Sequence, residues 1–284
     1  MVRRDPRTFA LTQTRWTLAA LREVCDWLTL TSLSGLARLL KRLHITWKRG
    51  RSYIHSPDPD YAAKLEYVQS LRDYVAQAAG EQILVYLDEV TVERHPTLSY
   101  DYEQAGAFQP LARRSERRNT ATRVVATLEA TTGCVCYRRA SHITLSTLVH
   151  FYRDLCAAYP NAERIYVVQD NWPLHFHPDV LVALEPQQSP WPVYRPANWT
   201  TQPRQSAQHR YGAAQLPIQL VPLPTYASWT NPIEKLWRKL RQEVTHLHRW
   251  ADDLLTLRTQ IDHFLDQFAG GSLDLLHYVG LLPD

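Results

Sequence analysis

Two short apolar runs place the strongest limit on what this chain can fold into. Residues 83–87 read Ile-Leu-Val-Tyr-Leu and residues 165–168 read Ile-Tyr-Val-Val, without the polar alternation of a strand that has one wet face. Such continuous runs are typical of strands buried on both faces. A helical pattern at 144–158 lies between them. The sequence therefore predicts an α/β domain whose central strands are covered by helices.

An acidic residue follows each run, Asp88 after the first and Asp170 after the second. Open α/β sheets place their sites beyond the carboxyl ends of strands, so the two carboxylates converge if the strands are parallel neighbours. Hard divalent cations bind such oxygens. In the alternative interpretation, each Asp only forms a turn or caps a helix.

A third acidic residue, Glu234, also has two interpretations. Asn231 is suited to cap a helix and Pro232 to occupy its first position, and Glu234 then follows three residues after the cap. Glu234 is thus either the reciprocal partner in a capping box or a third carboxylate of a site formed with Asp88 and Asp170.

Charge divides the chain unevenly. Residues 1–56 hold eleven Lys and Arg against three acidic residues, a net charge of +8, so the remainder carries −4 of the total of +4. A small basic head on a mildly acidic body indicates a nucleic-acid-binding module attached to another domain.

Within the head, apolar spacing predicts a helix over 17–30 and a second helix that begins at Ser34 as N-cap. This pair is typical of a helix-turn-helix, followed by an extended basic arm or wing at 46–51. The alternative is a solvated cationic helix face. The basic residues predicted to contact DNA are Arg38, Lys41, Arg42, Lys48, Arg49 and Arg51.

Other elements are predicted by the same patterns. A connecting helix is expected over 58–80, a strand within 98–108, a hairpin formed by 122–131 and 134–139, a helix at 178–184 and an amphipathic helix in 252–284. A second basic cluster lies between the early strands, where phosphate contact is favoured over a solvated loop; its members are Arg113, Arg114, Arg117 and Arg118.

Three motifs resemble those of mariner-like DDE transposases, in the branch found in bacterial insertion sequences. The string Leu-Pro-x-Tyr-x-x-x-x-Asn-Pro-Ile-Glu-x-x-Trp from Leu223 is similar to the third motif of that branch. Residues 86–89 are similar to its first motif, and 169–171 followed by His175 to its second. The string Arg-Leu-Leu-Lys-Arg-Leu at 38–43 resembles the second helix-turn-helix of the family.

The resemblance implies a fold and an activity. The fold is a small all-α, winged helix-turn-helix domain at 1–57, the connecting helix at 58–80 and an RNase H-like mixed-sheet catalytic domain at 81–284. The activity is binding of transposon terminal inverted repeats, metal-dependent DNA cleavage and transfer of the freed 3′ end to target DNA at TA sites. A homodimer is implied as well.

The resemblance also implies roles for particular residues. Asp88, Asp170 and Glu234 are expected to be the catalytic triad and to hold two Mg²⁺ ions, with Mn²⁺ as a substitute. Asn171 and His175 are candidates for support of the triad, His175 either by orienting Asp170 or by touching the scissile phosphate. A satisfied structural histidine is the alternative. Glu89 points away from Asp88 by the two-residue period of a strand, so it is left out of the metal site.

Two departures from the family pattern stand out. Only one helix-turn-helix is recognisable, so either recognition of the ends is incomplete or another chain supplies the first unit. Asp170 and Glu234 are 64 residues apart, a longer spacing than family members usually have. The excess is a Pro- and Gln-rich insertion at about 185–215. It is either a clasp that holds a DNA end or stacks on an unpaired base, or a disordered loop.

Other functions are weighed against this one. No apolar run approaches the roughly 20 residues that span a bilayer, and no secretory signal is recognisable, so a cytoplasmic, nucleoid-associated protein without a membrane partner is expected. A catalytically silent remnant that acts as a repressor or accessory end-binder is the main alternative. A structure-selective nuclease of the RNase H superfamily is a third, which the helix-turn-helix pattern disfavours.

Overall fold

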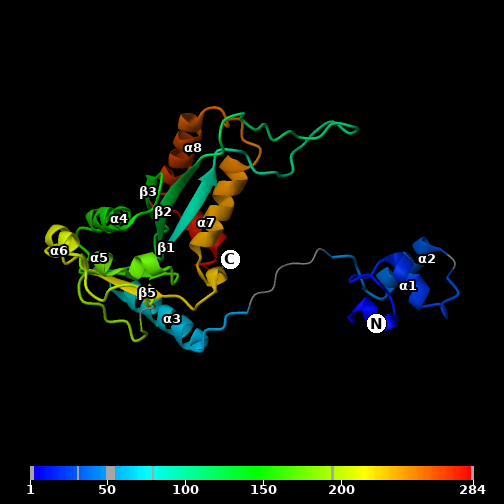
Figure 1. The fold of residues 1–284 in the computed structure, drawn as a ribbon, viewed down its shortest axis with the longest axis horizontal. Helices are drawn as coiled ribbons and strands as arrows, with labels where there is room; N and C mark the ends of the chain where they lie inside the picture. Colours follow the sequence, from blue (N-terminus) through cyan, green and yellow to red (C-terminus); the bar gives the residue numbers. More distant parts are fainter. Residues whose placement is uncertain (1–2, 31, 49–54, 79, 193–194, 283–284) are drawn as a thin grey trace. The chain divides into compact units, whose positions relative to one another are not determined.

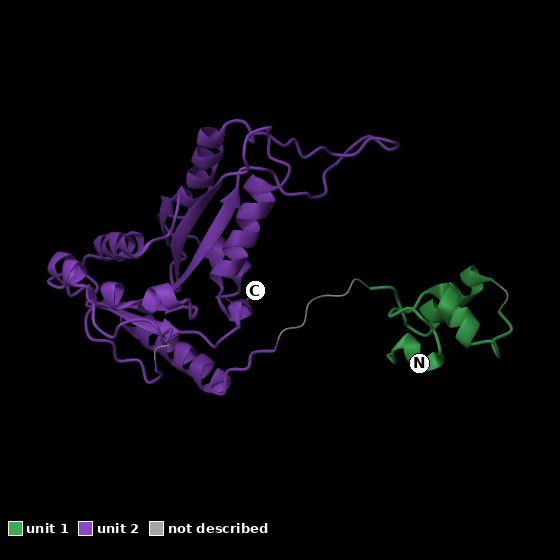
Figure 2. Cartoon of the chain, in the orientation of Figure 1, with its two compact units in different colours: residues 1–53 green, residues 54–284 purple. Residues whose placement is uncertain are grey.

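A computed structural model describes residues 3–30, 32–48, 55–78, 80–192 and 195–282. The chain divides into two compact units, residues 1–53 and residues 54–284 (Figure 2). The helix predicted over 58–80 belongs to the second unit as α3 (Tyr61–Gln77). None of the helices in the described part of the chain has the length and apolarity needed to cross a bilayer.

The first unit contains the 3₁₀ helix η1 (Pro6–Phe9) and two α-helices, α1 (Leu18–Val24) and α2 (Leu33–Arg42), which contact each other. Leu21 of α1 and Leu36 of α2 are buried. The basic arm predicted after α2 lies outside the described residues from position 49 onward, and so do Arg49 and Arg51.

Two predictions for this unit are wrong in detail. The helix predicted over 17–30 ends at Val24. The second helix is capped by Ser32 instead of Ser34, because Ser32 has extended backbone and its Oγ accepts from the Gly35 N–H at 3.1 Å. An N-cap side chain in this geometry satisfies one of the unpaired N–H groups of the first turn.

A five-stranded mixed sheet forms the centre of the second unit, in the order β3-β2-β1-β4-β5 (Figure 1). Adjacent strands pair antiparallel from β3 to β1 and parallel from β1 to β5. The two continuous apolar runs are the neighbouring central strands β1 and β4. The bounds are β1 (Gln82–Glu93), β2 (Ala121–Glu129), β3 (Val135–Ala140), β4 (Arg164–Gln169) and β5 (Ile218–Pro222).

Helices cover both faces of this sheet, which confirms the α/β prediction. Alternate side chains of β1 enter opposite apolar cores, Leu84 and Tyr86 one, and Val85 and Leu87 the other. The first core contains α3, α7 (Ile233–Leu240), α8 (Leu254–Asp266) and α9 (Leu273–Val279). The second contains α4 (Leu145–Ala158), α5 (Pro178–Leu181) and α6 (Gln205–Tyr211).

The first central strand is longer than predicted. Asp88 does not end it, because β2 continues to pair with β1 as far as Glu93 after the parallel partner β4 has stopped at Gln169. Asp88 therefore lies within a strand, at the level where only one neighbour remains.

The strand predicted within 98–108 is wrong. This segment has no ladder partner in the structure, apart from an isolated bridge between Thr97 and His246 at its base. It belongs to a long loop between β1 and β2 that stands away from the sheet (Figure 1). Several large apolar side chains of the loop are exposed: Leu98, Tyr100, Tyr102, Phe108 and Leu111.

The insertion at 185–215 packs onto the edge of the sheet. The side-chain amide of Gln187 donates to the Ile218 carbonyl at 2.9 Å and accepts from the Leu220 N–H at 2.7 Å, both on the edge strand β5. Trp191 packs on Tyr67 of α3 with ring centroids 5.2 Å apart. These contacts fix the described start of the insertion, up to residue 192, against the rest of the second unit, which favours a packed segment over the disordered-loop alternative there.

Candidate functional site

The register of the two central strands brings Asp88 and Asp170 together. Tyr86 of β1 is paired with Val168 of β4 in the parallel ladder. Two residues further on, the side chains have the same direction on both chains because strand side chains alternate with a period of two. Asp88 and Asp170 therefore lie at the same level of the two chains, where β4 ends, as expected for parallel neighbours.

Helix α7 contributes Glu234 in its first turn. Asn231 precedes the helix and is buried, and its Nδ2 donates to the Leu87 carbonyl of β1 at 2.9 Å. Among the described residues its Oδ1 has no hydrogen-bond partner, so the Asn231 side chain does not cap the helix. The capping-box interpretation of Glu234 is therefore wrong, and Asn231 instead ties the start of α7 to the strand that carries Asp88.

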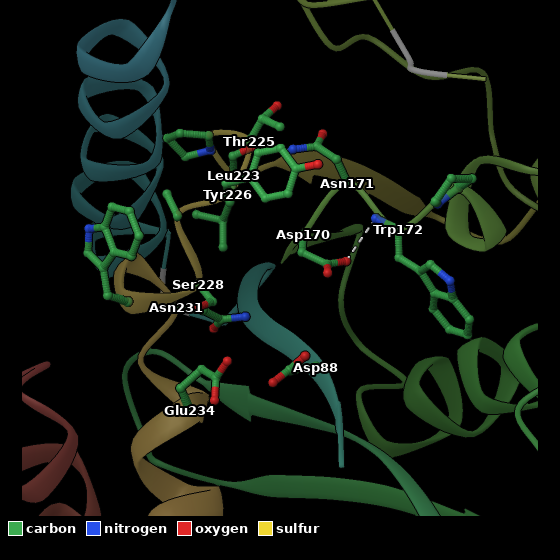
Figure 3. Close-up of a pocket in the computed structure, with 14 residues that line it drawn as sticks. Asp88, Asp170, Asn171, Trp172, Leu223, Thr225, Tyr226, Ser228, Asn231 and Glu234 are labelled. Atoms are coloured by element: carbon green, nitrogen blue, oxygen red, sulfur yellow. Dashed lines mark hydrogen bonds between the residues drawn. The ribbon is translucent and has the colours of Figure 1, made fainter. Parts of the chain in front are cut away.

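The three carboxylates border one pocket of about 710 Å³. In Figure 3, Asp88 and Glu234 are at the same end of it, and Asp170 lies nearer Trp172. The segment 223–231, which joins β5 to α7, forms much of the remaining wall. Of the residues predicted for support of the triad, Asn171 lines the pocket and His175 does not.

Neighbouring groups hold the carboxylates in place. The indole Nε1 of Trp237 on α7 donates to Asp88 Oδ2 at 2.9 Å, and the backbone N–H of Trp172 donates to Asp170 Oδ1 at 3.0 Å. Asn171 donates from Nδ2 to the Leu223 carbonyl at 2.7 Å. No functional role is assigned to Trp237 from the sequence, so its function as a hydrogen-bond donor to Asp88 was missed; its place in the third motif, three residues after Glu234, was the available signal.

Burial and mutual repulsion perturb the acids. Burial, followed by the charges of Glu234 and Glu89, raises the pKa of Asp88 to about 7. Burial also raises the pKa of Glu234, and the charge of Asp170 adds to this while Arg241 opposes it. A buried carboxyl repelled by like charges is stabilised by any cation that enters the pocket.

His175 does not line the pocket and is completely buried. Its Nε2 is 3.4 Å from Glu89 Oε1 and 3.7 Å from Asp170 Oδ1. Burial lowers the pKa of His175, but the charges of Glu89 and Asp170 outweigh this and leave it above its usual value. Direct contact with a phosphate, one of the predicted roles, does not fit complete burial, and the ring lies between two carboxylates instead.

The chemistry of the pocket fits a hard divalent cation. Carboxylate oxygens are the preferred ligands of such ions, and the unpartnered Oδ1 of Asn231 adds a neutral oxygen at the wall. Within the described residues, however, no group of three or more Asp, Glu, His or Cys side chains is arranged as a finished metal site. The oxygen donors therefore have the chemistry that a divalent cation needs, but in this structure they do not converge on a single metal position.

The predicted DNA-contacting residues lie in two places. Arg38, Lys41 and Arg42 on α2 and Lys48 after it are exposed, in the first unit. Arg113, Arg114, Arg117 and Arg118 are exposed in the long loop between β1 and β2. In that loop Ser115 is buried, and its Oγ donates to Asp252 Oδ1 at 2.5 Å, which fixes the loop between the two Arg pairs.

A mixed sheet with acids where the parallel pairing of two neighbouring strands ends and on a flanking helix is the arrangement expected of an RNase H-like nuclease fold. The sequence profile of the DDE superfamily endonucleases matches residues 83–258, which include all three acids, and the chain belongs to this family. The chain is also 21% identical over 276 residues to an uncharacterized 39 kDa protein of insertion element IS630 from Shigella sonnei, covering 95% of this chain and 71% of the relative.

Solved structures show the same fold. A Mos1 transposase paired-end complex with the left transposon end is 15% identical, with 93% of this chain and 73% of that chain covered and a TM-score of 0.57. Mos1 mariner paired-end complexes with Mn and with Mg are each 14% identical with TM-scores of 0.58, covering 95% of this chain and 76% and 77% of those chains. The predicted mariner-like fold and insertion-sequence branch are confirmed.

Proposed function

We propose that this endonuclease is a transposase that cleaves DNA at transposon ends and transfers the 3′ end to target DNA, at TA sites as the resemblance implies. The observation that carries the proposal is the shared pocket of Asp88, Asp170 and Glu234 in a chain of this family. The Mos1 structures, which hold transposon ends, support it by analogy of fold. A transposase of this kind would act on cellular DNA, in line with the expected cytoplasmic, nucleoid-associated location.

In this proposal the three acids hold two divalent ions, Mg²⁺ or Mn²⁺, which when bound supply the activation of the attacking oxygen and the stabilisation of the leaving one. The chain's own groups prepare that arrangement. Trp237 directs Asp88 by its indole N–H, and the Trp172 backbone directs Asp170. Asn231 keeps the helix that carries Glu234 against β1.

Double-stranded DNA is the proposed partner. Exposed Arg38, Lys41, Arg42 and Lys48 are suited to phosphate contacts by the first unit, with Arg49 and Arg51 continuing the basic sequence. The exposed arginines at 113–118 are suited to phosphate contacts by the catalytic unit. The domain limits proposed for these roles remain 1–57, 58–80 and 81–284, with the insertion at 185–215.

We further propose that the protein acts as a homodimer. Five large apolar side chains of the loop between β1 and β2 are more than two-thirds exposed, including Tyr100 and Tyr102 with essentially no cover. Exposed apolar patches of this kind are typical of protein interfaces. A second copy is the partner that a transposase bridging two DNA ends requires.

Cleavage of a supercoiled plasmid in Mg²⁺ or Mn²⁺ tests the proposal. The wild type is compared with Asp88→Asn, Asp170→Asn and Glu234→Gln, and with Glu243→Gln, which removes an exposed acid outside the pocket. We expect cleavage by the wild type and the Glu243 variant, and binding without cleavage by the other three. A wild type that binds but never cuts would instead indicate the silent DNA-binding remnant. Cleavage of RNA–DNA hybrids without preference for transposon ends would indicate the structure-selective nuclease.

A further inference from the structure

Large aromatic side chains border the carboxylate pocket, and two of them, Tyr226 and Trp229, are more than half exposed, while Trp172 packs edge-on against His175. The exposed fraction is 75% for Tyr226, 51% for Trp229 and 37% for Trp172. All three line the pocket together with Asp88, Asp170 and Glu234. Figure 3 shows Tyr226 and Trp172 at the rim, on either side of Asp170. A ring held in solvent contributes little to the apolar core, so its position needs another explanation.

The backbone of Tyr226 makes that position costly. Its φ is +53°, in the left-handed region that Gly adopts freely and bulky residues avoid. Packing against the other residues of the pocket wall does not compensate for this cost, because the Tyr226 ring remains largely exposed. Residues with strained backbone cluster at active sites and ligand-binding sites, so a strained residue at the rim of this pocket indicates a role in binding a ligand.

A buried latch keeps the strained turn in place. Both backbone polar groups of Thr225, the residue before Tyr226, are bound from the segment before α3. The Thr225 N–H donates to Asp58 Oδ2 at 2.7 Å, and the Thr225 carbonyl accepts from Ser56 Oγ at 2.6 Å. Lys64 forms a buried ion pair with the same Asp58 oxygen at 2.7 Å.

Further interactions stabilise the latch around Asp58 and Lys64. Burial would raise the pKa of Asp58, but Lys64 and the Thr225 N–H bring it down to about 2. Trp191 of the insertion covers the Lys64 ammonium, which lies 5.9 Å from the ring centroid. The second aromatic is tied to the same region, since Trp229 Nε1 donates to the Tyr61 hydroxyl at 3.3 Å.

We propose that Tyr226, with Trp229 beside it, is a stacking platform for an unpaired nucleobase next to the phosphodiester cut at the carboxylates. This inference rests on the proposed function and adds the form of its substrate. Every base has a π face, so stacking on an exposed ring does not depend on sequence. A phosphate held near Asp88, Asp170 and Glu234 through divalent ions would leave the adjoining base within the same pocket, where an unpaired base could reach the rings. The described aromatics of the insertion are engaged elsewhere, because Trp191 packs on Tyr67, Trp199 packs on His177 with ring centroids 4.7 Å apart, and Tyr211 is buried.

The test uses the full chain and two DNA probes in Ca²⁺, so that binding is measured apart from cleavage. One probe is a blunt duplex. The other is the same duplex with a short single-stranded arm that carries 2-aminopurine at the junction. We expect the wild type to bind the forked probe more tightly and to quench its fluorescence.

Variants separate stacking from folding. Tyr226→Leu is expected to weaken binding of the forked probe about fivefold or more, with little change for the blunt probe, and to abolish the quenching. Tyr226→Phe keeps the ring and should keep both effects. Tyr226→Gly relieves the strained φ, so its melting temperature should equal or exceed that of the wild type while the preference for the fork is lost. Tyr74→Leu, an equally bulky change at a half-exposed tyrosine of α3 that does not line the pocket, should match the wild type.

Two results would overturn the inference in different ways. If Tyr226→Leu and Tyr226→Gly keep the fork preference and the quenching, the platform is wrong while the transposase proposal stands. If the wild type binds neither probe, DNA as the substrate is wrong, and the platform fails with it.

Discussion

Replacing Asp88 with Asn should stabilise the metal-free protein at alkaline pH much more than at acid pH. Asn has nearly the same shape, and its Oδ1 can still accept from Trp237, so the change removes mainly the charge. The folded chain holds the pKa of Asp88 at about 7, against an ordinary value of 3.8. Between these values the folded state keeps a proton that the unfolded state has lost, so the free energy of unfolding decreases as pH rises.

The magnitude follows from the shift. A difference of about 3 pKa units corresponds to on the order of 4 kcal/mol at pH 8, of which about 3 kcal/mol develops between pH 5 and pH 8. The Asn variant does not carry this penalty. Its stability relative to the wild type should therefore increase by about that amount over the same interval.

Urea unfolding in EDTA at pH 5 and pH 8, followed by tryptophan fluorescence, measures this difference. Glu243→Gln is the control, because it removes an exposed carboxylate and should follow the wild type at both values. If the difference between the wild type and Asp88→Asn is the same at pH 5 and pH 8, Asp88 is ionised in the folded protein like an ordinary carboxylate and the reasoning is wrong.

Three further predictions concern metal, catalysis and DNA. Mg²⁺ added at pH 8 should raise the melting temperature of the wild type and have much less effect on Asp88→Asn, because a ligand stabilises only the state that binds it; equal shifts would place the ion elsewhere. Trp237→Phe removes the donor to Asp88 and should slow plasmid cleavage about 10- to 100-fold, as expected for loss of a hydrogen bond to a charged group; a folded variant with the wild-type rate would contradict this. Arg38→Ala should reduce the slope of log binding constant against log salt concentration by about one, and Lys41→Ala likewise; an unchanged slope in a filter-binding titration would exclude phosphate contact by these residues.

Local patterns in the sequence predicted the central fold well. The runs at 83–87 and 165–168 became β1 and β4, because an uninterrupted apolar run can be satisfied only between two layers of helices. Their pairing as parallel neighbours was only a condition in the sequence argument. Register depends on contacts between segments about eighty residues apart, which no local pattern reports.

The predictions that were wrong also depended on contacts between segments far apart in the sequence. Asn231 has the local signature of a helix cap, but a backbone carbonyl of β1 takes its side chain instead. The segment 98–108 has apolar residues suited to a strand, yet no partner strand lies beside it in the structure. The latch of Asp58 on Thr225 joins residues 167 positions apart and was not foreseen. In each of these cases the structure is determined by the presence or absence of a partner far away in the sequence, and local sequence patterns cannot identify such a partner.

The contact of Gln187 with β5 has a consequence for the behaviour of the protein in solution. An edge strand with unpaired N–H and C=O groups can recruit a strand from another molecule, which leads to aggregation. Here the amide of one side chain occupies the Ile218 carbonyl and the Leu220 N–H, as a backbone neighbour would do. The insertion thus blocks the β5 edge of the sheet, at Ile218 and Leu220, against the addition of a strand from another molecule.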